Sequence, residues 1–264
     1  MSAETVRLSD SHCHLAEAVL HTRLPEVLAE AAAAGVGRFV VPAVHQSDWA
    51  TVAQLVQLDA VSAAAFGVHP WFADSEWTAD SAAALDRQFR RYADAWVGEI
   101  GLDFYRAADE TQRAAQQTAF RTQLALAQQY RRPIVLHNVR AGAAVWAAVR
   151  DTGFTQGGIA HAFSGSLEEA RQFVRHGFFI GIGMMLLNPN AKKLRRTAAE
   201  LPLEYLLLET DSPFMLRDAV NSPANVRCVA ETLAQLRGIT LAEVAVQTER
   251  NLTRLLNRER FQAA

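Results

Sequence analysis

The sequence predicts an α/β fold, a single (β/α)8 barrel of the TIM type with an additional C-terminal helix. Eight short apolar segments rich in β-branched residues alternate with longer segments of helical periodicity. Most of the apolar segments lack polar alternation, as expected for parallel strands that are covered on both faces. A chain of 264 residues is a typical length for a barrel of this kind. We therefore expect one domain, residues 1–264.

The eight predicted strands come in order along the chain, and each is followed by a segment that can form a helix. The strands are residues 6–11, 38–44, 63–69, 96–103, 134–138, 159–163, 178–183 and 205–211. The clearest amphipathic segments are residues 24–34, 82–92, 111–130 and 167–176, and a ninth, residues 241–257, closes the chain. An open doubly wound sheet shares this alternation, but it places its ligand at one switch point. Here polar residues mark nearly every strand end, which favours a barrel.

Composition excludes several classes of protein. Half of the residues are hydrophobic, a fifth are charged and the net charge is -2, so we expect a globular protein without the basic surface of a protein that coats duplex DNA. Cys13 and Cys228 lie far apart and indicate a reducing, cytoplasmic location. We find neither a signal-peptide pattern nor an apolar run of about 18 residues, so we predict no membrane partner. No obligate protein partner is predicted either.

Two histidines lie at the carboxyl end of the first predicted strand, in the segment that begins at Asp10. In an alternating strand His12 and His14 point to the same side, so both imidazoles can reach one ion. A lone histidine is more often structural or solvated. The pair, placed at the mouth of a barrel, predicts a metal site.

The fourth predicted strand carries two carboxylates, Glu99 and Asp103, in an apolar and glycine-rich stretch. A buried carboxylate without a partner is costly, so Glu99 needs a cation. Two metal ions that share its two oxygens would satisfy it, and a salt bridge to an arginine is the alternative. We expect Asp103 to hydrogen-bond a metal ligand rather than to bind the metal itself.

Further polar residues end the fifth, sixth and eighth predicted strands. His137 and His161 arrive from adjacent strands and resemble the ligands of a second metal, although each alone could be a core histidine. Asp211 is placed to contact a metal-bound water. Glu209 lies on the same side and could orient a histidine or pair with an arginine.

These residues fall in six ordered motifs that span the chain, and the chain resembles the TatD family of metal-dependent nucleases within the amidohydrolase-like barrels. The motifs begin at Asp10 (Asp-Ser-His-Cys-His-Leu), Gly67 (Gly-Val-His-Pro), Gly98 (Gly-Glu-Ile-Gly-Leu-Asp), His137 (with Arg140), His161 (His-Ala-Phe-Ser-Gly) and Glu209 (Glu-Thr-Asp-Ser-Pro).

The resemblance implies two divalent metal ions per chain, zinc, manganese or magnesium. It implies that one ion is held by His12, His14 and Asp211 and the other by His137 and His161. It also implies that Glu99 bridges the two ions. Related barrels use a carboxylated lysine as the bridge, but the first six predicted strands of this chain contain no lysine.

Several residues are candidates for substrate contacts. His69 and Arg140 follow strands and could meet a phosphate oxygen or the leaving group, and loop histidines are also common. Ser164 and Gly165 could contact the substrate, or serve only the turn. The basic cluster 192–196 is either a substrate grip or a solvated helix face. Many family members carry Arg-Asn-Glu-Pro after the last strand, whereas this chain has Val220-Asn221-Ser222-Pro223.

The expected activity is a metal-dependent deoxyribonuclease or exonuclease that cleaves phosphodiester bonds in single-stranded DNA or RNA. Two ions lower the pKa of a shared water, so that hydroxide can attack phosphorus. Asp211 then handles the proton and His69 assists the leaving group, with Glu99 as the third predicted catalytic residue. The alternatives are a D-aminoacyl-tRNA deacylase or other ester or amide hydrolase at the same site, and a non-catalytic metal-binding protein.

Overall fold

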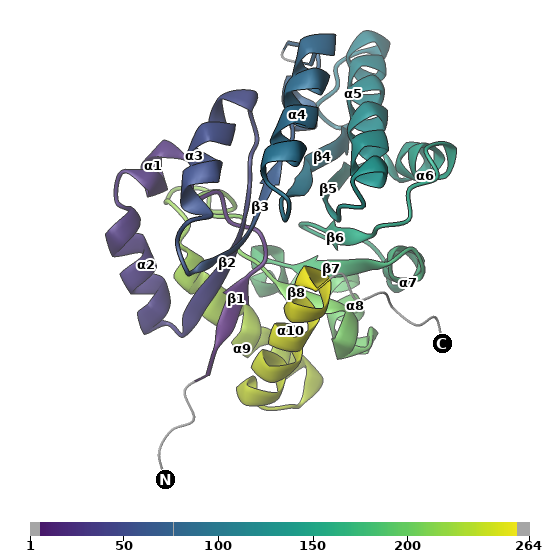
Figure 1. The fold of residues 1–264 in the computed structure, drawn as a ribbon. Helices are drawn as coiled ribbons and strands as arrows, with labels where there is room; N and C mark the ends of the chain where they lie inside the picture. The colour runs from purple at the N-terminus through teal and green to yellow at the C-terminus, as the bar shows by residue number, and fades with distance from the viewer. Residues whose placement is uncertain (1–5, 76, 258–264) are drawn as a thin grey trace. The chain divides into compact units, whose positions relative to one another are not determined.

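The computed structural model describes residues 6–75 and 77–257, and part of the amino-terminal segment, for which no signal peptide is predicted, lies outside them. Figure 1 shows the strands and helices in colours that follow the chain. The strands form one eight-stranded sheet in chain order, which is the order of a (β/α)8 barrel. They are β1 (Leu8–Asp10), β2 (Val36–Pro42), β3 (Val61–Phe66), β4 (Trp96–Asp103), β5 (Ile134–Val139), β6 (Gly158–Ala160), β7 (Phe178–Ile182) and β8 (Leu206–Leu208).

At least one helix follows every strand, and the predicted additional helix ends the described chain. The helices are α1 (Ala18–His21), α2 (Leu24–Ala33), α3 (Trp49–Leu55), α4 (Ala79–Arg91), α5 (Glu110–Gln129), α6 (Gly142–Asp151), α7 (Leu167–Arg175), α8 (Lys192–Glu200), α9 (Val226–Arg237) and α10 (Leu241–Leu256). Local signals set several helix ends. Ser166 and Thr240 form capping boxes at the starts of α7 and α10, and Gly238 ends α9 in the left-handed conformation. No described helix is long and apolar enough to cross a membrane.

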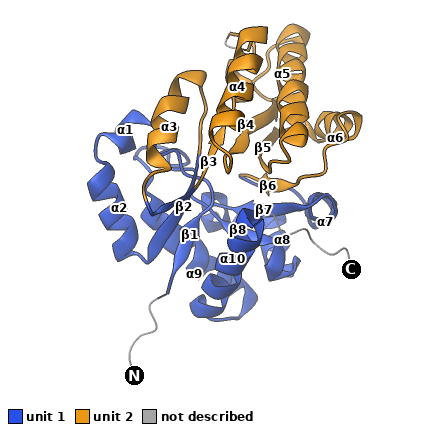
Figure 2. Ribbon diagram, viewed as in Figure 1, with its two compact units in different colours: residues 1–41, 59–62, 162–264 blue, residues 42–58, 63–161 orange. Residues whose placement is uncertain are grey.

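The residues of the chain group into two compact units, each with many contacts within itself (Figure 2). Unit 1 consists of residues 1–41, 59–62 and 162–264, and unit 2 of residues 42–58 and 63–161. In unit 1, β1 pairs with β2 and β7 with β8, all parallel. In unit 2, β3, β4, β5 and β6 pair in that order, also parallel. The assignment of residues 1–264 to a single domain stays a prediction.

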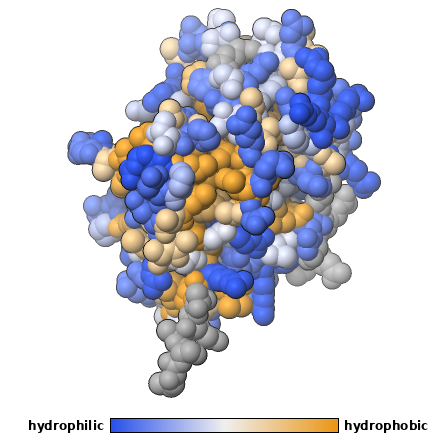
Figure 3. All heavy atoms as spheres, turned by 60° about the vertical axis from the view of Figure 1, so that its left-hand side comes forward, coloured by the Kyte–Doolittle hydropathy of each residue, from blue (hydrophilic) through white to orange (hydrophobic). Residues whose placement is uncertain are grey.

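Each unit has an apolar core made by strands and the helices that follow them. The largest side chains that are fully buried include Phe39, Phe178 and Phe179 in unit 1 and Phe66, Phe89, Trp96 and Phe120 in unit 2. All eight residues of β4 are buried, as expected for a strand covered on both faces. On the face drawn in Figure 3, polar residues surround an apolar area that reaches the surface. Such exposure is ordinary for a folded protein.

The predicted strand at residues 6–11 is too long at its carboxyl end, and the argument that placed His12 and His14 on an alternating strand is wrong in that respect. β1 ends at Asp10, and both histidines lie in the segment that follows. An isolated parallel bridge between Cys13 and Ser212 holds this segment extended. Backbone hydrogen bonds from His14 to the Ser212 carbonyl and from Asp211 to the His12 carbonyl, 2.8 and 3.0 Å, replace the strand pairing.

Two glutamines of α5 hold the polypeptide where β3 and β4 end. The Gln123 amide accepts a hydrogen bond from the Val68 N–H (2.8 Å) and donates one to the Val68 carbonyl (3.1 Å). Two turns earlier, Gln116 makes the same pair of bonds with the backbone of Asp103, at 2.9 and 3.3 Å. Both side chains are buried. These bonds fix the backbone beside His69 and at Asp103 itself.

We expect the Gln123→Leu variant to lose about 2–4 kcal/mol of unfolding free energy, because it leaves a buried N–H and a buried carbonyl of Val68 without partners. The measurement is urea unfolding followed by circular dichroism. Gln117→Leu on the same helix is the matched control, since the Gln117 side chain makes no hydrogen bond within the described residues, and it should change stability by less than about 0.5 kcal/mol. Equal losses in both variants would contradict this role of Gln123.

Candidate metal centre

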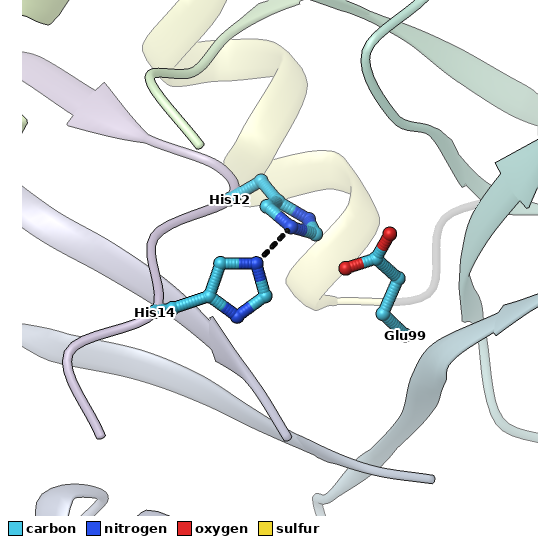
Figure 4. Close-up of side chains that lie close together, drawn as sticks. All are labelled: His12, His14 and Glu99. Carbon is cyan, nitrogen blue, oxygen red and sulfur yellow. Dashed lines mark hydrogen bonds between the residues drawn. The ribbon is translucent and has the colours of Figure 1, made fainter. Parts of the chain in front are cut away.

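Three side chains of unit 1 converge on one point, and we call them the unit 1 cluster: His12, His14 and Asp211. The two imidazoles turn toward each other after β1, and their Nε2 atoms lie 3.0 Å apart (Figure 4). Asp211 Oδ1 lies 3.1 Å from His14 Nε2 and 3.5 Å from His12 Nε2. Both histidines are buried. The cluster therefore presents two nitrogens and one oxygen to a common point.

The spacing of these three atoms fits a metal ion. Ligand atoms about 2.0–2.1 Å from a tetrahedral zinc ion lie about 3.3 Å from one another. The three separations in the unit 1 cluster, 3.0, 3.1 and 3.5 Å, fall around that value. Two imidazoles and a carboxylate are also a donor set that suits zinc or manganese.

The buried side chain of Asp10 ties together the two chain segments that carry this cluster. It accepts hydrogen bonds from the His12 N–H (3.2 Å), the Thr210 N–H (3.0 Å) and the Thr210 hydroxyl. Burial raises the pKa of Asp10 to about 7, although these hydrogen bonds act in the opposite direction. Asn221 adds a bond from its amide to the Thr210 carbonyl, 2.9 Å. The positions of His12 and Asp211 thus depend on Asp10 and its partners.

Unit 2 gathers a second set of ligand atoms around Glu99, and we call it the unit 2 cluster: His69, Glu99, His137 and His161. The Glu99 side chain comes from β4 and is also drawn in Figure 4. Its Oε1 lies 2.8 Å from His137 Nδ1, 3.3 Å from His69 Nε2 and 3.5 Å from His161 Nε2. His69, Glu99 and His137 offer ligand atoms within 4.8 Å of one another. The cation that the sequence demands for Glu99 thus has a set of donors around it.

Asp103 orients His137 from the side opposite Glu99. Its Oδ2 lies 3.3 Å from His137 Nε2, while His137 Nδ1 faces Glu99. Burial lowers the pKa of His137, but the hydrogen bonds with Asp103 and Glu99 outweigh it and raise the pKa to about 9. For Asp103, burial favours a higher pKa, but bonds from His137 and Trp71 hold it well below its usual range. An ionised Asp103 that accepts from Nε2–H keeps that proton in place, so a metal ion would displace only the Nδ1 proton, the arrangement common around metal-bound histidines.

His69 has a different role from the other histidines of the unit 2 cluster. Its Nδ1 accepts a hydrogen bond from the Trp71 N–H, 3.2 Å, so a neutral ring carries its proton on Nε2. Nε2 is the atom that faces Glu99. His69 is therefore arranged to donate a hydrogen bond from Nε2. A hydrogen bond can stabilise a leaving oxygen without transfer of the proton to it.

Three further residues singled out from the sequence differ in burial and in hydrogen bonding. Glu209 is buried and accepts a hydrogen bond from the Ala162 N–H, 2.6 Å. Ser164 is exposed. Arg140 is exposed and stacks on Tyr105, 4.5 Å from the guanidinium carbon to the ring centroid. The roles predicted for these residues in substrate binding stay predictions.

Three features outside the clusters bear on the sequence argument. In the basic cluster, Arg196 pairs with Glu200 and Arg195 donates to the Leu186 carbonyl, which favours a helix face over a substrate grip. Ser222, in place of the frequent family glutamate, caps a short 3-10 helix by accepting from the Ala224 N–H. Sequence reasoning missed Trp71, although its position two residues after His69 in a Pro-Trp-Phe turn was a signal.

The chain is similar to known proteins over almost its whole length. A family model described as TatD related DNase matches residues 9–257. The crystal structure of YjjV, a TatD homologue from Escherichia coli K12, has a TM-score of 0.88 at 34% identity and covers 96% of this chain and 98% of that chain. This likeness and the strand order confirm the predicted (β/α)8 barrel.

Two curated relatives have a similar extent. The uncharacterized metal-dependent hydrolase YabD of Bacillus subtilis strain 168 is 33% identical over 253 residues, which are 94% of this chain and 98% of the relative. The 3'-5' ssDNA/RNA exonuclease TatD of Edwardsiella piscicida is 33% identical over 244 residues, which are 88% of this chain and 92% of the relative.

The Asp103→Asn variant should bind divalent metal at the unit 2 cluster about 10- to 100-fold more weakly, because an amide no longer holds the proton of His137 on Nε2. Calorimetric titration of the metal-free protein with zinc at pH 7.5 measures this. Asp109→Asn, a few residues downstream in the same connection, is the control, since asparagine caps α5 as well as aspartate does. Unchanged affinity in Asp103→Asn would remove this residue from the metal centre.

Proposed function

The chain belongs to the TatD family of metal-dependent hydrolases, and we propose that it is a deoxyribonuclease that digests single-stranded DNA from an end. The observation that carries the proposal is the convergence of imidazole nitrogens and carboxylate oxygens at ligand spacing in the unit 1 cluster. The relative from Edwardsiella piscicida is named an exonuclease of single-stranded DNA and RNA. The matching family model is described as TatD related DNase.

We assign one divalent ion to His12, His14 and Asp211 and a second to His137 and His161. The family resemblance supports Glu99 as a further residue that would hold the ions through its carboxylate. Because the ligands are rich in imidazole, zinc and manganese suit them better than magnesium, which prefers oxygen ligands. Magnesium stays among the expected ions because a carboxylate bridge provides hard oxygen donors.

When bound, two divalent ions lower the pKa of water and neutralise the charge that develops on phosphate oxygens during hydrolysis. The side chains of the chain perform the remaining steps. The Asp211 carboxylate, whose Oδ1 lies beside the two proposed ligand nitrogens, would accept the proton of the attacking water on its other oxygen. His69 stabilises the leaving oxygen by donating a hydrogen bond from Nε2. The residues of β4 are all buried, so bulk water is kept away from the backbone that carries Glu99.

The proposal is tested with metal-reconstituted protein and three substrates: single-stranded DNA, single-stranded RNA and a D-aminoacyl-tRNA. We expect nucleotides to be released from the DNA, and turnover to fall by at least about 100-fold in His137→Ala and in Asp211→Ala, since each removes a ligand of one ion. Arg131→Gln is the control variant, because this exposed residue precedes β5 and contacts neither cluster.

Each other outcome contradicts the proposal in a distinct way. Release of the amino acid alone from the tRNA would make the chain an ester hydrolase with the same ligands. Hydrolysis of RNA without hydrolysis of DNA would make the chain a ribonuclease and not a deoxyribonuclease. Absence of turnover with zinc, manganese and magnesium would favour a metal-binding protein without catalysis.

A further inference from the structure

Four exposed side chains of unit 2 form two stacked pairs beyond the carboxyl ends of β3, β4 and β5. The Arg106 guanidinium carbon lies 3.8 Å from the centroid of the Trp71 ring, and that of Arg140 lies 4.5 Å from the Tyr105 ring centroid. Trp71 is 41% exposed and Tyr105 is 66% exposed. We call Trp71, Tyr105, Arg106 and Arg140 the stacking patch.

Tyr105 of the stacking patch contributes little to the apolar core. A tyrosine that remains 66% exposed buries little of the apolar area that usually makes an aromatic residue stabilising. Neither Arg106 nor Arg140 pairs with a carboxylate among the described residues, so both positive charges remain available to an anion. Arg140 also has a φ of +54°, an unfavourable backbone conformation for a residue other than glycine, and such conformations concentrate at functional sites.

A single carboxylate connects the stacking patch to the unit 2 cluster. Asp103 accepts hydrogen bonds from the Trp71 indole N–H (2.6 Å) and from the backbone N–H groups of Tyr105 and Arg106 (both 3.0 Å). The same side chain contacts His137 Nε2. The patch thus lies one side chain away from a proposed metal ligand. A substrate held by it would have its next linkage close to the unit 2 cluster.

Aromatic rings beside unpaired guanidinium groups match the chemistry of a nucleic-acid strand. A single strand offers flat bases that stack on aromatic side chains, and phosphates that attract arginine. A duplex hides its bases in its own stack, so it can use only the arginines. We propose that the stacking patch binds single-stranded nucleic acid beside the bond to be cleaved, an inference that rests on the proposed function. Trp71 and Tyr105 stack on bases. Arg106 and Arg140 contact phosphates.

The test measures binding of a fluorescent single-stranded oligonucleotide by anisotropy, with the Asp211→Ala protein in manganese as the background so that hydrolysis during the measurement is at least about 100-fold slower. Tyr105→Leu should weaken binding about 5- to 100-fold, the range for loss of one stacked base, while Tyr105→Phe should stay near the parent because it keeps the ring. Trp71 is left unchanged because its indole also bonds Asp103.

The arginine is tested through the salt dependence of the same binding. Loss of one phosphate contact should make the slope of log affinity against log salt shallower by about 0.7 in Arg140→Gln. Tyr105→Leu should leave that slope unchanged. Arg131→Gln is a close control, because Arg131 is also exposed, has a φ of +56° and lies at the other end of β5.

Hydrolysis separates failure of this inference from failure of the proposed function. In this assay Asp211 is kept, and the Tyr105→Leu variant is compared with the unsubstituted enzyme. Both proteins are measured on the oligonucleotide and on bis(p-nitrophenyl) phosphate, a diester without bases. We expect Tyr105→Leu to lose about tenfold more activity on the oligonucleotide than on the small diester. Equal losses on both, or binding as tight as that of the parent, would overturn the stacking patch while leaving the nuclease intact. Absence of hydrolysis of both substrates by the unsubstituted chain would overturn the nuclease, and the binding data would still decide the patch.

Discussion

A carboxylate that is buried in an apolar strand must be surrounded by donors or cations, and Glu99 imposes this constraint on unit 2. Three imidazoles from the ends of β3, β5 and β6 surround its Oε1 at 2.8–3.5 Å. A metal ion held by His137 and His161 would satisfy Glu99 best, because it replaces ring protons with a fixed positive charge, while His69 keeps its Nε2 proton. The ordering of the other polar groups in the unit follows from this requirement.

Two further buried carboxylates do not face a metal site directly but hold the residues that do. Asp10 in unit 1 and Asp103 in unit 2 are both buried, and each bonds the backbone or the side chain of a proposed ligand. Asp103 is itself held by Gln116 of α5. The helices therefore contribute to the chemistry by fixing the segments that follow the strands. This explains why polar residues occur on buried faces of α5, where packing alone would favour leucine.

The sequence predicted the eight strands because fully buried parallel strands are almost uniformly apolar, and the polar residues at their ends stood out against that background. It did not predict where β1 ends, since the extended path through His12 and His14 depends on pairing with Ser212, about 200 residues away. The pairing of Arg140 with Tyr105 was missed for a similar reason. Two loops determine it, and neither loop has a periodic pattern. Asp103 was correctly placed beside a ligand, but its bonds to Trp71 and Arg106 depend on tertiary structure.

If the unit 1 and unit 2 clusters hold one divalent ion each, the number of ions bound per chain is two. Equilibrium dialysis of the metal-free protein against manganese, followed by elemental analysis, gives this number. We expect two ions in the unsubstituted protein and one in each of the His14→Ala and His161→Ala variants, with the fold intact by circular dichroism. A single ion in the unsubstituted protein, or two ions in either variant, would contradict this assignment.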